Sequence, residues 1–186
     1  MKKILFFILI VGLCSVNSFS QDDEMKLWME YMTPGKEHQE LASMDGDWVY
    51  TSKMWMDPSA PPEIYTGTAK CEMILGGRYS QMTAKGNVMG MDFQGVSITG
   101  FDNAKKVWMA VWVDNMGTGI LYMEGKHDPA TNKVVYKGTA VDPMTGKDME
   151  MIETFKIVNE NTIEMEMFNV VDGKEYKSME LIYTRK

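Results

Sequence analysis

The sequence of 186 residues predicts an all-β protein: a closed antiparallel up-and-down β-barrel of about ten strands, preceded by a short helical segment. Apolar and polar residues alternate with a period of two from Gly46 to the C-terminus, which is typical of half-buried strands. Short sequences rich in Gly, Asn, Asp and Pro separate these segments and favour tight turns. Ten sequential antiparallel strands in an open sheet would expose two long edges, and closure into a barrel removes both.

Residues 1–20 have the pattern of a secretory signal peptide. Lys2 and Lys3 form a positive start, residues 4–13 form a short apolar run, and Ser18-Phe19-Ser20 is a small-x-small cleavage sequence. The apolar run is shorter than a membrane-spanning helix requires. We therefore expect an exported protein, periplasmic or extracellular, that begins at Gln21 and has no membrane attachment after signal removal.

Residues 21–45 predict an N-terminal helical cap. The segment Asp22 to Met32 begins with acidic residues, which suit a helix N-terminus, and its apolar residues recur at spacings of three and four. Pro34-Gly35 ends this helix. A second, shorter helical segment is expected from Lys36 to Ser43, before Met44-Asp45-Gly46 breaks the pattern.

Residues 46–186 form the predicted barrel domain. The expected strands, each bounded by turn residues, are Asp47–Asp57, Glu63–Leu75, Arg78–Asn87, Met91–Asp102, Lys106–Asp114, Gly119–Lys126, Lys133–Val141, Lys147–Val158, Thr162–Val171 and Lys174–Thr184. The connections between them are mostly of hairpin length, as in Gly76-Gly77 and Asp172-Gly173.

The segment Lys106–Asp114 is apolar on both alternating faces. If Trp108, Ala110 and Trp112 point into the barrel, the valines and the methionine of the opposite face point outward and need a cover. One candidate cover is the N-terminal helix with Trp28, and the other is a second copy of the chain in a homodimer.

Composition excludes several classes of partner. The formal net charge is −7, and no cluster of basic residues longer than two precedes the C-terminus. Nucleic acid and anionic membrane surfaces are therefore poor partners. Cys71 is the only cysteine after residue 20, so no disulfide can form within the mature chain, and we expect this thiol to be buried rather than paired with another chain.

The sequence contains no recognised catalytic or metal-binding motif. His38 and His127 are the only histidines, and together with Cys71 they match no zinc spacing. There is no Gly-x-Ser-x-Gly motif, and no helix follows the glycines of residues 86–90 as a phosphate loop requires. We therefore expect no metal and no cofactor and assign no catalytic residue.

The inward faces of the predicted strands are rich in methionine and aromatic residues. Methionine is flexible and polarizable, so these residues either adapt to an apolar guest or fill an irregular core. Glu153 shares its face with Met151 and Phe155, and Arg78 shares its face with Ser80. A carboxylate and a guanidinium paired inside the barrel could orient a polar ligand group. The alternatives are a bulge that turns Glu153 to solvent and a purely structural ion pair.

Seven sequence motifs resemble a bacterial family of unknown function, DUF1579. They are WMEYMTPGKEH, LASMDGDW, KMWMDPSAPP, MILGGRY, GFDNAKK, WVDNMGTG and DPMTGK. The resemblance implies a lipocalin-like or calycin-like barrel and brings no activity with it. Gly46-Asp47-Trp48 is similar to the Gly-x-Trp that opens the first lipocalin strand, where the Trp plugs the barrel floor. Related haem barrels use a histidine near their last strand, and Lys174–Thr184 has none.

Three hypotheses for function follow. The first is an exported module that binds a small apolar or amphipathic molecule. Its expected binding residues are Trp48, Tyr50, Met54, Trp112 and Met165 as the lining, with Arg78 and Glu153 as polar contacts. The second is an enzyme that uses Glu153 as general acid or base. The third is a dimerising interaction protein with a solid core.

Overall fold

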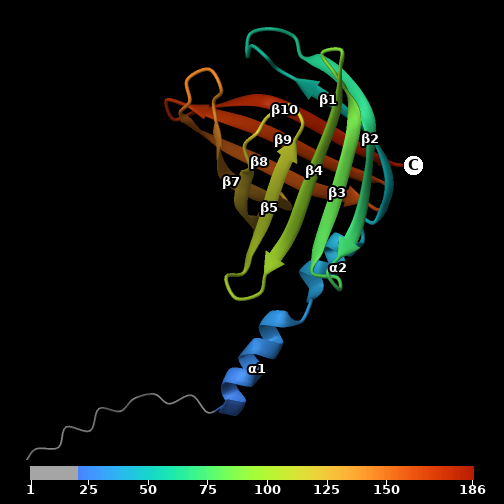
Figure 1. Cartoon of the computed structure of the whole chain (residues 1–186), viewed down its shortest axis with the longest axis vertical. Helices are drawn as coiled ribbons and strands as arrows, with labels where there is room; N and C mark the ends of the chain where they lie inside the picture. Colours follow the sequence, from blue (N-terminus) through green and yellow to red (C-terminus); the bar gives the residue numbers. More distant parts are fainter. Residues whose placement is uncertain (1–20) are drawn as a thin grey trace, which may run out of the picture.

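A computed structural model describes residues 21–186, and the signal peptide expected over residues 1–20 lies outside the described residues. Ten antiparallel strands form a closed barrel in which each strand pairs with its neighbours along the chain and the last strand pairs with the first (Figure 1). The predicted closed up-and-down barrel is confirmed. Within residues 21–186, no helix has the length and apolar character needed to cross a membrane.

The elements follow the predicted order. The helices are α1 (Gln21–Met32) and α2 (Lys36–Ala42), and the strands are β1 (Gly46–Met54), β2 (Glu63–Ile74), β3 (Tyr79–Val88), β4 (Met91–Asp102), β5 (Val107–Asp114), β6 (Leu121–Asp128), β7 (Lys133–Val141), β8 (Asp148–Asn159), β9 (Thr162–Val171) and β10 (Lys174–Arg185). The first strand ends before the expected Asp57, because the carboxylate of Asp57 accepts a hydrogen bond from the backbone N–H of Ser59 (2.8 Å) and starts a turn.

One end of the barrel is closed by Trp48. Its side chain is 1% exposed, and its indole Nε1 donates a hydrogen bond to the carbonyl of Met44 (2.8 Å). The guanidinium of Arg185 lies 4.3 Å from the centre of the Trp48 ring. Arg185 also donates to the carbonyls of Asp45 (2.6 Å) and Glu160 (2.7 Å). These contacts join the first and last strands at the closed end, near α2.

Burial follows the predicted alternation. On β1, the buried Trp48, Tyr50 and Ser52 alternate with exposed residues. On β5, Trp108 and Ala110 are buried, and Trp112 shares their inward position. Cys71 is buried and free, as expected, and burial raises the pKa of its thiol to about 12.

Of the two candidate covers for the outer face of β5, the N-terminal helix with Trp28 does not pack on the barrel. No residue of α1 is buried, and Trp28 is 61% exposed. Figure 1 shows α1 projecting away from the barrel, whereas α2 lies at the closed end and contacts β2, β3 and β4. The break at Pro34-Gly35 separates the two helices, and only α2 packs on the strands. A homodimer that covers these surfaces stays a prediction.

A group of ion pairs joins four strands on the outer face. Glu166 on β9 accepts hydrogen bonds from Lys133 on β7 (2.6 Å) and Lys177 on β10 (2.5 Å). Lys177 also lies 3.5 Å from Glu180, which pairs with Lys53 on β1 (2.8 Å). The two lysines hold the pKa of the Glu166 carboxyl at about 2, well below its usual range.

We expect Glu166→Gln to lower the free energy of unfolding by about 1–2 kcal/mol at neutral pH, because both lysines lose a charged partner. The stabilisation by the wild-type carboxylate is complete above the ordinary glutamate pKa and is lost as the pH falls toward a pKa of about 2. The difference between the two proteins should therefore shrink on acidification. Urea unfolding at pH 7, 4 and 3 measures it. Glu164→Gln, an exposed neighbour on the same strand, should change little at any pH.

Candidate binding site in the barrel interior

Glu153 lies on the inner face of β8. Its neighbours in register are Tyr136 on β7 and Met167 on β9, and both are buried. Glu153 is 8% exposed, and no hydrogen bond or ion pair joins its carboxyl to another described residue. Loss of hydration raises the pKa of this carboxyl to about 8, so most of it is protonated at neutral pH.

Two further polar atoms inside the barrel lack partners. The Oγ atom of Ser52 on β1 and the Oδ1 atom of Asn169 on β9 are buried without a hydrogen bond within the described part of the chain. Asn169 on β9 pairs in register with Met151 on β8, and Met151 is the next inward residue before Glu153 on β8. The side chains of Asn169 and Glu153 are therefore diagonal neighbours on adjacent strands. Asn169 belongs to no sequence motif, but the alternation of β9 places it on the same strand face as Met165 and Met167.

Two buried tyrosines face the same region as Glu153. The pKa values of the Tyr136 and Tyr183 hydroxyls are raised, first by burial and then by the nearby charge of ionised Glu153. Both phenols therefore stay neutral over the physiological pH range. The ring of Tyr183 lies 5.8 Å from that of Tyr50, measured between ring centres. The interior thus carries hydroxyl, amide and carboxyl groups within an apolar wall.

Arg78 does not join this group. It is exposed and precedes β3, and its guanidinium donates hydrogen bonds to the carbonyls of Met32 (2.7 Å) and Leu75 (3.2 Å). The predicted pairing with Glu153 is therefore wrong. The physical reason is the turn at Gly76-Gly77, where both glycines have positive φ and Arg78 lies outside the alternating part of the strand.

The other predicted residues line the inner wall. Trp48 lies at the closed end, whereas Tyr50, Met54, Trp112 and Met165 occupy inward positions farther along their strands. Several apolar side chains at inward positions remain only half-buried although the sheet is closed around them. They are Met73, Met82, Phe93, Phe101, Trp112, Leu121, Phe155, Ile157, Met165 and Met179. These side chains pack against the buried core and keep part of their surface accessible.

Glycines on neighbouring strands let the large rings lie flat against the wall. A Cβ atom at Gly67 would overlap the ring of Tyr50, and one at Gly95 would overlap the ring of Trp112. Once the strands are aligned, the sequence itself indicates these close contacts, because a glycine occupies the inward position next to each aromatic ring.

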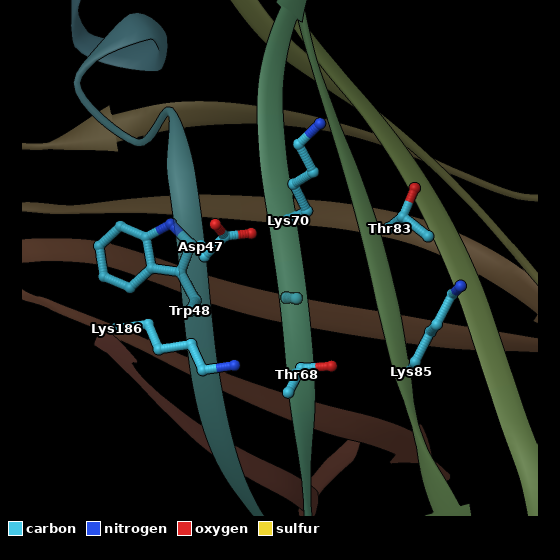
Figure 2. A pocket seen from close by; sticks show the side chains of 8 residues that line it. Asp47, Trp48, Thr68, Lys70, Thr83, Lys85 and Lys186 are labelled. Atoms are coloured by element: carbon cyan, nitrogen blue, oxygen red, sulfur yellow. The ribbon is translucent and has the colours of Figure 1, made fainter.

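The polar surface hollow in Figure 2 lies on the outside of the barrel. It has a volume of about 350 Å³ and is lined in part by Thr68 and Lys70 on β2 and by Thr83 and Lys85 on β3. These side chains alternate with the buried Ala69 and Ala84, so they project from the outer face. Solvated lysines and threonines on an open strand surface do not enclose a ligand.

The histidines take structural positions. His38 is buried, and its Nδ1 accepts a hydrogen bond from the backbone N–H of Gly35 (3.0 Å). His127 is exposed and lies 3.0 Å from Oδ1 of Asn132 through its Nε2. Within residues 21–186 no three His, Cys, Asp or Glu side chains are grouped as a metal site requires.

The fold and the interior define a class of protein: a closed ten-stranded antiparallel barrel that encloses polar groups within an apolar wall. The chain belongs to the family described as "Protein of unknown function (DUF1579)", which matches residues 33–185. The match includes α2 and the strands, and α1 lies before it. No curated protein matches the chain.

We expect Glu153→Gln to remove a pH dependence of stability. A carboxyl whose pKa is about 8 in the folded state and ordinary in the unfolded state stabilises the fold fully below the ordinary value, and this contribution is lost as the pH rises toward 8. The variant should resemble the wild type at pH 5 and exceed its free energy of unfolding by at least about 1 kcal/mol at pH 8. Urea unfolding at both values measures the difference.

The matched control for this experiment is Glu150→Gln, which changes an exposed glutamate on the outer face of β8. It should leave the free energy of unfolding nearly unchanged at both pH values. An equal response of the two variants would contradict the buried state of Glu153.

Proposed function

We propose that the protein is an exported binding protein that holds a small apolar or amphipathic molecule inside its barrel. The observation that carries the proposal is the set of unpartnered polar groups on the inner face: Ser52 Oγ, Asn169 Oδ1 and the carboxyl of Glu153. Each buried polar group without a hydrogen bond costs about 1–3 kcal/mol of folding stability. A ligand that hydrogen-bonds to these groups would recover part of that free energy.

The apolar wall supports the same proposal. Met165 and Met179 are half-buried and lie in register with Phe155 and Met167, near the level of Glu153. Unbranched thioether side chains can change rotamer to fit ligands of different shape. An apolar pocket with a few convergent polar groups is the usual composition of a small-molecule site.

The resemblance to lipocalins indicates through which end of the barrel a ligand would enter. Trp48 closes one end together with Arg185, as the Gly-x-Trp resemblance implies for a barrel floor. A ligand would therefore enter through the opposite end, where β1 finishes at Met54. Export is proposed from the sequence pattern of residues 1–20.

Binding is better supported than catalysis by Glu153. A carboxyl with a pKa of about 8 is suited to proton transfer at neutral pH. However, burial raises the pKa values of Cys71, Tyr136 and Tyr183, so none of these neighbours in the interior supplies an anionic nucleophile at that pH. A single carboxyl without a second reacting group favours recognition over turnover.

We expect Ser52→Ala to lower ligand retention without lowering stability. Removal of a buried hydroxyl that lacks a partner should leave the free energy of unfolding unchanged or raise it by up to about 1 kcal/mol. Native mass spectrometry of freshly purified protein, before and after extraction with organic solvent, should show an additional organic mass in the wild type and less of it in the variant. Thr51→Ala, an exposed neighbour on β1, is the control and should retain the wild-type amount.

An added mass that is equally abundant in all three proteins would place the ligand elsewhere. Absence of any copurifying organic molecule from every preparation would count against the proposal.

We expect Met165→Trp to separate a hollow interior from a solid one. In a hollow barrel the larger ring occupies free space, so the free energy of unfolding should change by less than about 1 kcal/mol while the copurifying molecule is excluded. In a filled core the same change should destabilise the fold by about 1–3 kcal/mol. Chemical unfolding and native mass spectrometry on the same samples give both readouts, and Glu164→Trp on the outer face is the control.

A further inference from the structure

We propose that the interior site selects a ligand with a protonated amine on an apolar body, and this inference rests on the proposed binding function. The enclosed polar groups without a partner can all accept a hydrogen bond: the carboxyl of Glu153, Oδ1 of Asn169 and Oγ of Ser52. Asn169 Oδ1 can only accept a hydrogen bond, and an ionised carboxylate only accepts. A primary ammonium group supplies three N–H donors and a positive charge.

The placement of charge along the inner face points to the same ligand class. Besides Glu153, Asp114 occupies an inward position toward the open end, where its carboxylate accepts the indole N–H of Trp112 (2.6 Å). At the rim of this end, the exposed Glu63 starts β2 in register with Met54, and the exposed Lys174 starts β10. A cation entering through this end would pass carboxylates before it reaches Glu153. A carboxylate ligand would meet repulsion along the same path.

Basic residues do not balance these acids in the interior. Arg185 lies at the closed end and is held by backbone carbonyls and by the Trp48 ring. Lys174 starts β10 at the tip of the β9–β10 hairpin and is exposed. Ser52 and Glu153, both more than nine-tenths buried, therefore have no cationic partner within the described residues.

Aromatic rings add a second contribution to cation binding. The rings of Phe93 and Trp112 stack with their centres 6.3 Å apart, and Tyr50 lies on a neighbouring part of the wall. The faces of such rings attract an ammonium or a substituted ammonium group. The same rings provide apolar contact for the body of the ligand, so both parts of an apolar amine have complementary surfaces.

Amine binding should tighten as the pH rises toward 8, because the Glu153 carboxyl becomes ionised over this range. The other titratable groups that face Glu153 are the Tyr136 and Tyr183 hydroxyls, which stay neutral because their pKa values are raised. The inward residues of β9 next to Glu153, Met167 and Asn169, do not titrate. The pH dependence should therefore be that of one carboxyl.

The experiment compares three probes with one ring system: 1-naphthylmethylamine, 1-naphthylmethanol and 1-naphthoate. Their dissociation constants are measured by isothermal titration calorimetry at pH 7.5, with protein freed of bound molecules. The amine should bind about tenfold more tightly than the alcohol, and the carboxylate should bind most weakly. Glu153→Gln should reduce amine affinity to that of the alcohol and leave alcohol binding unchanged, whereas Glu150→Gln should preserve the wild-type order.

Equal affinities for the amine and the alcohol, or tightest binding of the carboxylate, would overturn the amine inference and leave the interior binding site intact. Binding of none of the three probes would overturn the interior site itself. Loss of binding of both amine and alcohol in Glu153→Gln, with unchanged circular dichroism, would also overturn the specific role of the charge.

Discussion

The pairing of β1 with β10 is the constraint on which the rest of the structure depends. Its register runs from Trp48 opposite Arg185 to Met54 opposite Met179, and it turns a ten-stranded ribbon into a ring. Only in the closed ring are the inner faces of all strands withdrawn from water at once. The raised pKa of Glu153 and the unpartnered hydroxyl of Ser52 are both consequences of this closure. A slip of one residue in this pairing would turn the inner set of β1 outward.

Strands β8 and β9 show how the barrel tolerates polar groups in its interior. The inner face of β9 carries Asn169 beside Met165, whereas its outer face carries Glu166 between Lys133 and Lys177. The outer ion pairs stabilise the same strand whose inner face bears an unpartnered amide oxygen. Alternation of side chains along a strand separates these roles spatially, so the outer surface can offset the cost of the inner one. Polar groups with no structural partner require a partner from outside the chain, such as an ordered water, an ion or a ligand.

The fold was largely predictable because a period of two and turn residues determine strands and hairpins locally. The bounds of Met91–Asp102, Lys133–Val141 and Thr162–Val171 agree with the prediction, and the inward direction of Glu153 followed from parity alone. The alternation of inward and outward residues gave a wrong direction for Arg78, because this residue follows a turn and lies outside the regular strand. It also could not reveal the missing partners of Ser52 and Asn169, which depend on residues far away in the sequence. The spacing of apolar residues in α1 predicts a helix, but it does not predict that no residue of this helix is buried in the structure.

The position of Glu153, away from the open end of the barrel, determines which parts of a ligand the proposed site could distinguish. On β8, Met149 and Met151 occupy the inward positions between Glu153 and the open end, so a polar head must pass flexible side chains to reach the carboxyl. The apolar body of the ligand would then lie among these methionines and Met54. Fixed acceptors at depth impose strict requirements on the head group, because an unmatched buried polar group remains costly. Adaptable thioethers near the entrance impose weak requirements on the body. Under the proposed binding function, this arrangement would allow one kind of head group to be recognised on many kinds of apolar molecule.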